Sequence, residues 1–267
     1  MFRSVGFIGT GNMGSAVAKA VYQSGAFERL LLSDQTVSKA KSLAAELPGA
    51  VVSTNEEIAA TCDLIFLGVK PYAVTEVLRK LKPIFDTRSD RFILCSMVTA
   101  LSCEELQKES GAPVIRIMPN TPVAIGAGVT EFCSCGVTEA ELTDFKALLS
   151  GSGVVDPLDE SLMDAASSVS GCGPAFACLF AEALADGGVA CGLPRDKALL
   201  YAAGMLEGTA RLLRETGKHP GELKDAVCSP GGTTIEGVRV LEGSGFRGAA
   251  MNAVVAAYEK TLRIKKE

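Results

Sequence analysis

The chain has 267 residues, of which 48% are hydrophobic and 21% charged, and its formal net charge is −5. This length suffices for one large domain or two ordinary ones, and the composition predicts a well-buried globular core. The only basic cluster is the short tail Lys260–Lys266, so no nucleic-acid partner is expected. The single histidine, His219, argues against a Ser-His-Asp triad, a histidine-rich zinc centre and a histidine general base.

The nine cysteines contain no CxxC pair. Cys133 and Cys135 are the closest two, and no histidine lies near them, so no metal site is predicted. We therefore expect free, mostly buried thiols in a reducing cytosol, and hence a cytoplasmic protein. The longest apolar stretch, Ala175–Leu193, is interrupted by Glu182 and Asp186 and by a glycine pair, which favours a buried helix over a membrane span. No membrane partner is expected.

The first half of the chain alternates between apolar strands and helices with apolar residues at helical spacing. This alternation predicts a parallel, doubly wound sheet. The expected strands are Ser4–Ile8, Leu30–Leu32, Asp63–Val69, Phe92–Ser96 and Val114–Met118. The expected helices are Gly14–Ser24, Val37–Leu47 and one that runs from Pro71 to about Leu81.

After about Asp156 the β-branched runs fade, and helical patterns rich in alanine, leucine and glycine replace them. We therefore expect an α/β domain over residues 1–156 and an all-α domain over residues 157–267. The helices that begin at Ala175 and Arg195 are apolar over more than one face, which either a second subunit or a large core would cover. The expected helices are Leu162–Val169, Ala175–Cys191, Arg195–Glu215, Gly221–Val227, Thr234–Leu241 and Arg247–Lys260.

The segment Gly9–Gly14 has the pattern GxGxxG between an expected strand and an expected helix. In that context the first glycine makes the turn, the second lets the backbone approach a pyrophosphate, and the third allows close packing of helix and strand. The segment predicts a dinucleotide-binding Rossmann domain. No ligand would be implied if it were only a glycine-rich turn.

Residues near the ends of the following strands bear on which dinucleotide binds. Asp34 lies where an acid normally bonds the ribose 2′-hydroxyl and favours NAD, whereas Ser33 and the lysines at 39 and 41 would serve a 2′-phosphate. The residues alone leave this choice open. Lys70-Pro71 ends a buried strand and either contacts cofactor or substrate or is an ordinary loop. Asn55 either caps a helix or meets the adenosine.

The segment Ser229–Thr234 reads Ser-Pro-Gly-Gly-Thr-Thr and precedes a helical pattern. Pro230 and the two glycines fix a tight turn. A loop that delivers backbone N–H groups and hydroxyls to a helix N-terminus predicts an anion site.

The chain resembles the Δ1-pyrroline-5-carboxylate reductases through a set of motifs that occur in the family's order and span nearly the whole sequence. The Ser229–Thr234 segment is highly specific to that family, whereas GxGxxG is not. The sequence departs from the family at Cys172 and Cys228, where a small hydroxyl residue is usual, and we expect altered packing with retained activity. The matching motifs are Gly9–Gly14, Val69–Pro71, Met118–Pro122, Val169–Phe176 and Asp225–Thr234.

The resemblance implies a helical C-terminal dimerisation domain, a homodimer in which the site lies between the Rossmann domain of one chain and the helical domain of the other, and in some members a ring of dimers. It implies NADP(H) as preferred cofactor with NAD(H) also accepted. The implied catalytic residue is Thr234, at the nitrogen of a cyclic imine that carries a carboxylate. The residues implied at the dinucleotide are Ile8, Gly9, Thr10, Gly11, Asn12, Met13, Ser33, Asn55, Val69, Lys70 and Pro71. Those implied at the substrate are Glu160, Asp225, Val227, Cys228, Ser229, Gly232 and Thr233.

Two other classes of function compete with this interpretation. A β-hydroxyacid dehydrogenase or another imine reductase shares the two-domain plan, but such dehydrogenases use a lysine early in the second domain, and Gly173–Gly192 contains none. A protein that senses NADP(H) without turnover would not need the Ser229–Thr234 loop.

Overall fold

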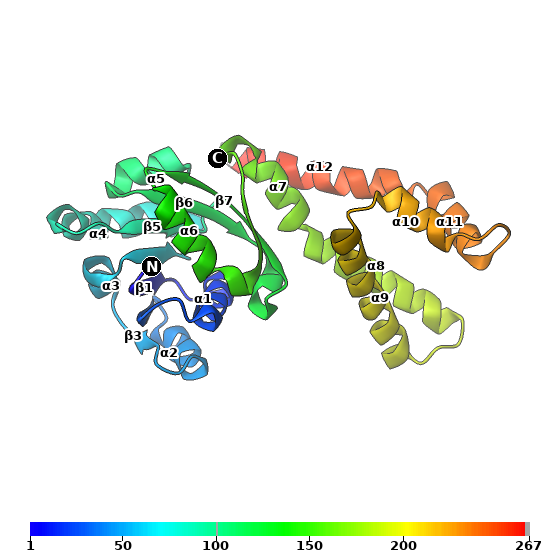
Figure 1. The fold of residues 1–267 in the computed structure, drawn as a ribbon, viewed down its shortest axis with the longest axis horizontal. Coiled ribbons are helices and arrows are strands. Elements are labelled where there is room, and N and C mark those ends of the chain that lie inside the picture. The colour runs from blue at the N-terminus through cyan, green and yellow to red at the C-terminus, as the bar shows by residue number, and fades with distance from the viewer. Residues whose placement is uncertain (100, 265–267) are drawn as a thin grey trace. The chain divides into compact units, whose positions relative to one another are not determined.

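The N-terminal half folds around one twisted sheet in the computed structural model, which describes residues 1–99 and 101–264 (Figure 1). The strand order is β3-β2-β1-β4-β5-β6-β7-β8, and every neighbouring pair is parallel except β6 with β7. The predicted doubly wound, mostly parallel sheet is confirmed. The strands are β1 (Ser4–Ile8), β2 (Arg29–Ser33), β3 (Val51–Val52), β4 (Leu64–Leu67), β5 (Ile93–Ser96), β6 (Val114–Pro119), β7 (Gly128–Cys135) and β8 (Gly153–Pro157).

Each face of the sheet carries its own apolar core, because successive residues of a strand point to opposite faces. Phe7 and Phe66 stack with ring centroids 4.4 Å apart in one core, while their neighbours Ile8 and Leu67 belong to the other. The helices that accompany the sheet are α1 (Asn12–Ser24), α2 (Val37–Glu46), α3 (Asn55–Thr61), α4 (Val74–Thr87), α5 (Cys103–Ser110) and α6 (Glu139–Leu148).

Several elements of this half were not predicted. Strand β7 runs antiparallel to β6, and it contains Thr130, Glu131 and Ser134 among its apolar residues, so it has no continuous apolar run. Helices α5 and α6 each begin with a capping box, formed by Ser102 with Glu105 and by Thr138 with Glu141. That S/T-x-x-E signature was available in the sequence.

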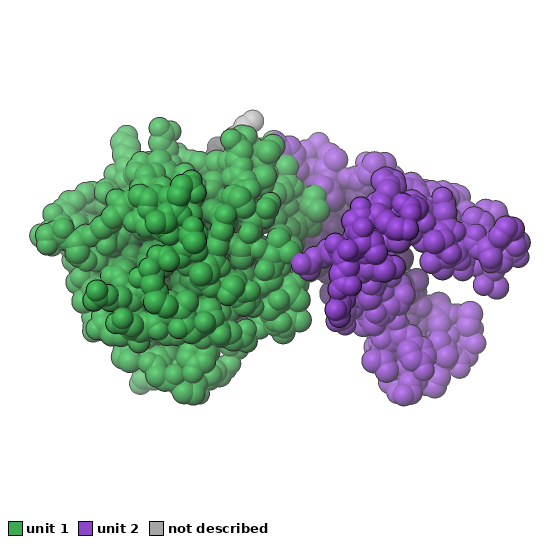
Figure 2. Space-filling view, viewed as in Figure 1, with its two compact units in different colours: residues 1–171, 260–267 green, residues 172–259 purple. Residues whose placement is uncertain are grey.

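All six predicted C-terminal helices are present, with bounds shifted by a few residues. They are α7 (Met163–Ser170), α8 (Gly173–Ala190), α9 (Arg195–Thr216), α10 (Pro220–Val227), α11 (Thr233–Gly243) and α12 (Phe246–Ile264). The chain separates into two compact units, residues 1–171 with the chain end from residue 260, and residues 172–259 (Figure 2). Helix α7 packs against β7, which places it in the first unit. The division at residues 156 and 157 stays a prediction.

The expectation that α8 is a buried helix is wrong for the single chain. Ala185 is its one buried residue, and Leu179 is 68% exposed. The stretch Glu160–Ala190 contains an 18-residue window with a mean hydropathy of 1.3, long and apolar enough to cross a membrane, but length and composition alone make this weak support for a span. The expectation of mostly buried thiols is also wrong: of the nine cysteines only Cys62, Cys95 and Cys103 are buried. Hydropathy reports which surface favours burial, but it does not say what buries it.

Candidate functional site

The three glycines of the Gly9–Gly14 loop occupy three different environments. Gly9 has φ +100°, and a Cβ there would lie 2.6 Å from the carbonyl carbon of Gly68. A Cβ on Gly14 would lie 2.1 Å from the carbonyl oxygen of Gly9, whereas one on Gly11 would meet no atom within 4 Å. Gly9 and Gly14 are therefore required by packing, and Gly11 leaves the backbone open to a ligand, as a pyrophosphate cradle requires.

The first residues of α1 supply neither a side-chain cap nor a negative charge to the N-terminus of the helix. Its N-cap is Gly11, which supplies no side-chain hydrogen bond, and the first turn contains no acidic residue. Backbone N–H groups at this end and the positive end of the helix dipole therefore favour an anion. The loop and helix together fit the phosphates of a dinucleotide.

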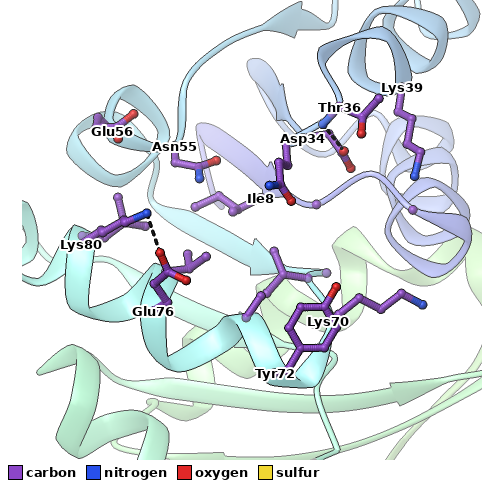
Figure 3. A pocket seen from close by; sticks show the side chains of 18 residues that line it. Ile8, Asp34, Thr36, Lys39, Asn55, Glu56, Lys70, Tyr72, Glu76 and Lys80 are labelled. Atoms are coloured by element: carbon purple, nitrogen blue, oxygen red, sulfur yellow. Dashed lines mark hydrogen bonds and ion pairs between the residues drawn. The ribbon is translucent and has the colours of Figure 1, made fainter.

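A cavity of about 440 Å³ lies at the carboxyl ends of β1, β2 and β4 (Figure 3). A second cavity of about 330 Å³ shares Gly11 and Lys39 with it and is also lined by Thr10 and Asn12. This is the edge of a parallel sheet at which nucleotides bind. The predicted cofactor residues that line the larger cavity are Ile8, Gly9, Gly11, Asn55, Val69 and Lys70.

Three predicted cofactor residues line neither cavity. Met13 packs against an apolar core, and Pro71 begins a 3-10 turn, Pro71–Ala73. Ser33 is buried, and its Oγ donates to Oδ1 of Asn55 over 2.7 Å. The interpretation of Asn55 as a helix cap is wrong, because Thr54 caps α3 by accepting from the Glu57 N–H.

Both carboxylate oxygens of Asp34 already accept hydrogen bonds from the chain. Oδ2 accepts from the Thr10 N–H and Oδ1 from the Thr36 N–H, each over 2.8 Å. Asp34 therefore braces the glycine-rich loop against the end of β2. This role weakens the sequence argument that Asp34 serves chiefly to select a ribose hydroxyl.

The larger cavity also contains side chains that the sequence search passed over. Tyr72 is 88% exposed and lies on the cavity wall (Figure 3). Glu76 and Lys80, one turn apart on α4, form an ion pair of 2.7 Å that lowers the pKa of Glu76. An exposed aromatic ring beside a nucleotide cavity offers a stacking surface. The available signal was the tyrosine two residues after Lys70.

The Ser229–Thr234 loop forms the predicted turn before a helix. Gly231 has φ +68°, and the Gly232 N–H donates to the Ser229 carbonyl over 3.0 Å. Gly232 is the N-cap of α11 and supplies no side-chain hydrogen bond, while Thr233 and Thr234 are exposed in its first turn. The N-terminus of α11 therefore presents backbone N–H groups and two hydroxyls to solvent, which suits a carboxylate.

The predicted substrate residues just before this loop end helix α10. Asp225 is exposed and forms an ion pair with Lys224, which raises the pKa of that lysine. Val227 is 65% exposed, and Cys228 is half-buried. These residues and the loop thus form one continuous segment of the second unit.

Glu160, the remaining predicted substrate residue, belongs to the first unit. Its Oε1 accepts from the Cys103 N–H over 2.8 Å and from Nη1 of Arg116 over 3.2 Å. Arg116 is fully buried and also pairs with Asp164, with Nη2 and Oδ1 3.8 Å apart. The Glu160 carboxylate is therefore held by donors of its own unit.

Two family models and several curated relatives match the chain. A family model described as pyrroline-5-carboxylate reductase dimerisation matches residues 160–264, and one described as NADP oxidoreductase coenzyme F420-dependent matches residues 4–98. The chain is 40% identical to the pyrroline-5-carboxylate reductase of Pisum sativum over 98% of its length and 96% of the relative's. It is 35% identical to that of Escherichia coli over 100% of both chains.

Solved structures agree with these sequence relationships. The pyrroline carboxylate reductase of Plasmodium falciparum, solved with NADP bound, superimposes with a TM-score of 0.85 at 30% identity over 98% of both chains. A pyrroline-5-carboxylate reductase from Coxiella burnetii gives a TM-score of 0.88 at 26% identity, again over 98% of both chains. With the glycine-rich cradle, the helical C-terminal half and full-length relatives in agreement, this chain belongs to the pyrroline-5-carboxylate reductase family.

Proposed function

We propose that the chain is a pyrroline-5-carboxylate reductase that transfers hydride from NADPH to the imine of 1-pyrroline-5-carboxylate and forms L-proline, the last step of proline biosynthesis. The observation that carries the proposal is 40% identity to a reductase of that name over 98% of the chain. The Gly11 cradle and the uncapped α11 N-terminus supply this chain's own sites for a dinucleotide and a carboxylate.

The first unit holds the dinucleotide in this proposal. The cofactor supplies the hydride, and the chain's residues bind and orient it: Gly9–Gly14 at the phosphates, Asn55, Val69 and Lys70 along the larger cavity, and Ser33 and Pro71 next to these residues. We infer a preference for NADP(H), with NAD(H) accepted. Lys39 lines both cavities and offers its charge to a 2′-phosphate, while the oxygens of Asp34 are already engaged.

The segment Asp225–Thr234 of the second unit, together with Glu160, binds the imine in this proposal. The N–H groups at the start of α11 take the substrate carboxylate, and the Thr234 hydroxyl forms the hydrogen bond at the ring nitrogen. A protonated imine is already electrophilic, so positioning and electrostatics suffice and no strong general acid is needed. The single histidine has a structural role in the second unit: Nδ1 of His219 accepts from the Gly221 N–H and caps α10.

Self-association completes the proposal. The exposed apolar residues of α8 and α9 and the match to a dimerisation family support a homodimer, and a ring of dimers is the larger assembly we would test for. The proposed partners are a second copy of the chain and its small-molecule substrate. Neither nucleic acid nor a membrane is proposed as a partner. The proposed location is the cytoplasm.

The test is oxidation of NADPH by the purified full-length protein in the presence of 1-pyrroline-5-carboxylate, with NADH run in parallel. We expect proline to form in equal amount to the NADPH consumed, and NADPH to give the higher kcat/KM. Turnover of a β-hydroxyacid or a different imine, without turnover of 1-pyrroline-5-carboxylate, would instead assign one of the related reductase classes. Tight NADPH binding with no turnover of any of them would indicate a sensor.

A further inference from the structure

Two thiols that are 30 residues apart in sequence meet where helix α5 packs against strand β7. Cys103 is the first residue of α5, Cys133 lies in β7, and their Sγ atoms are 3.5 Å apart. Cys103 is buried, whereas Cys133 is half-buried and lines a cavity of about 540 Å³ with Pro157, Asp159 and others. Cys133 is therefore the more exposed of the two cysteines, and Cys103 is the buried one.

The surroundings favour different protonation states for the two sulfurs. The contact between the two thiols, together with the Arg116 guanidinium, lowers the pKa of the Cys133 thiol. The same contact and burial raise the pKa of the Cys103 thiol. Arg116 stands opposite Cys133 in the register of β6 and β7, and its Nε has no hydrogen-bond partner among the described residues. Of the charged groups facing the pair, Arg116 favours the thiolate and Glu160 opposes it.

A bound metal ion is the competing interpretation of this cluster. One ligand atom each from Cys103, Cys133 and Glu160 lie within 4.8 Å of one another. The buried guanidinium of Arg116, with Nη1 3.2 Å from Oε1 of Glu160, opposes a divalent cation there. Three ligands with an adjacent fixed positive charge suit an activated thiolate better than a closed structural zinc site.

We propose that Cys103 and Cys133 are an oxidation site that forms a reversible intrachain disulfide when the enzyme meets a hydroperoxide. The Cys133 thiolate attacks the peroxide oxygen; a sulfur–oxygen bond forms, the O–O bond breaks, and the departing hydroxide takes a proton and leaves as water. The Cys103 sulfur then attacks the sulfenic sulfur; the S–S bond forms, the S–O bond breaks, and a second water leaves with the Cys103 proton. Two thiols are oxidised and hydrogen peroxide is reduced to two waters.

The geometry demands only a small movement for this reaction. The sulfurs must approach from 3.5 Å to about 2.05 Å, which side-chain rotation and a slight shift of the first turn of α5 can supply. The movement is coupled to Glu160, because the Cys103 N–H donates to its carboxylate over 2.8 Å. This coupling matters for catalysis only on the proposed function, in which Glu160 contacts the substrate.

The test treats the full-length protein with a small excess of hydrogen peroxide, blocks the remaining thiols by alkylation and maps the unreduced peptides. We expect a Cys103–Cys133 cross-linked peptide, loss of two of the nine alkylatable thiols, and recovery of both after reduction with dithiothreitol. Cys135→Ser is the matched control, since Cys135 lies two residues along the same strand and its thiol donates to Gln107 instead. The cross-link must persist in that variant.

Two further variants separate the roles of the sulfurs. Cys103→Ser should accumulate a sulfenic acid on Cys133 that dimedone traps, and Cys133→Ser should leave Cys103 reduced. Full alkylation of both thiols after peroxide treatment, a sulfinic acid on Cys133 of the native chain without a cross-link, or one bound zinc per chain that shields both thiols would each overturn the proposal. Circular dichroism of each variant verifies that it folds.

The effect on catalysis has a separate readout. We expect the disulfide form to have a several-fold higher KM for 1-pyrroline-5-carboxylate and an unchanged KM for NADPH. A cross-link that leaves both KM values unchanged would overturn the coupling through Glu160. Absence of turnover in the reduced enzyme would count against the proposed function alone, because the peptide map does not depend on it.

Discussion

The two units of this chain bury their apolar side chains in different ways. In residues 1–171 two continuous cores fill both faces of the sheet, with Phe7, Phe66 and Ile65 fully buried. In residues 172–259 only Ala185, Ala198 and Ala202 are buried and apolar. Large apolar side chains of α8 and α9 stand exposed, among them Leu179 at 68% and Leu200 at 60%.

Apolar segments of the sheet unit are buried within the chain, whereas apolar helices of the second unit stay exposed in the single chain. The sheet unit buries its apolar residues within one chain, and the residues that line its larger cavity all belong to that unit. The helical unit has only small buried apolar side chains, and its match to a dimerisation family supports the proposed homodimer, in which a second copy would cover its exposed apolar residues. We therefore expect perturbations of the helical unit to depend on protein concentration, and perturbations of the sheet unit not to.

The largest expected effect comes from a charge on the exposed apolar surface of α9. Leu200→Glu would place an unpaired carboxylate in the proposed subunit contact, at a cost of several kcal/mol. We expect self-association to weaken by about 100-fold or more, imine reduction to be lost at assay concentrations, and NADPH binding to persist. Light scattering, turnover and NADPH titration measure the three quantities.

Lys197→Glu is the control for that experiment, since it adds the same carboxylate to the same helix at an exposed, already charged position. It should leave assembly and turnover nearly unchanged. A dimeric, fully active Leu200→Glu protein would show that the apolar surface of α9 is not the subunit contact.

A smaller effect is expected at the anion-binding loop. Thr234→Ala removes the hydroxyl assigned to the ring nitrogen, and loss of one such hydrogen bond at the reacting group should lower kcat by about 100-fold. The Kd for NADPH should stay the same, because the dinucleotide residues lie in the other unit. Thr234→Ser retains a hydroxyl and should recover much of the rate. Unchanged turnover in Thr234→Ala would remove this residue from the mechanism.

The fold was predictable from the sequence where an element has a single consistent pattern of apolar residues. Apolar runs such as Leu64–Leu67 and the long helix α9 were found with bounds within a few residues. Strand β7 was missed because its sequence mixes polar residues with Phe132 and cysteines. It lies between β6 and β8 near one end of the sheet. Its pairing is set by the strand beside it, and that information is tertiary.

The candidate site was predictable as a set of motifs but not as a set of contacts. The turn chemistry of Gly9–Gly14 and Ser229–Thr234 follows from glycine and proline, and both turns formed as expected. The engagement of Asp34 with Thr10 and Thr36 depends on how β2 ends beside the glycine-rich loop, which no local pattern encodes. The same holds for the meeting of Cys103 with Cys133.

The glycine-rich loop offers a matched pair that separates folding from binding within the sheet unit. Gly14→Ala sets a methyl group against the Gly9 carbonyl oxygen, so we expect a cost of about 1–3 kcal/mol and a melting temperature lower by roughly 2–12 °C. Gly11→Ala meets no protein atom, so the melting temperature should hold while the Kd for NADPH rises about tenfold. Thermal unfolding and NADPH titration decide it. Equal loss of stability in both variants would contradict the assignment of Gly11 to the ligand.

The smallest expected effect concerns the choice of dinucleotide, and it tests whether the sheet unit alone makes that choice. Lys39 of α2 lines both cavities, and a charge-assisted bond to a 2′-phosphate is worth about 1.5–3 kcal/mol. Lys39→Ala should therefore raise the KM for NADPH by about tenfold and leave the KM for NADH unchanged, since NADH has no phosphate at that position. Lys41→Ala, two residues along the same helix and outside both cavities, is the control. If NADPH and NADH lost affinity equally in Lys39→Ala, the lysine would act on a part common to both cofactors, and the discrimination would have to come from residues other than those of α2.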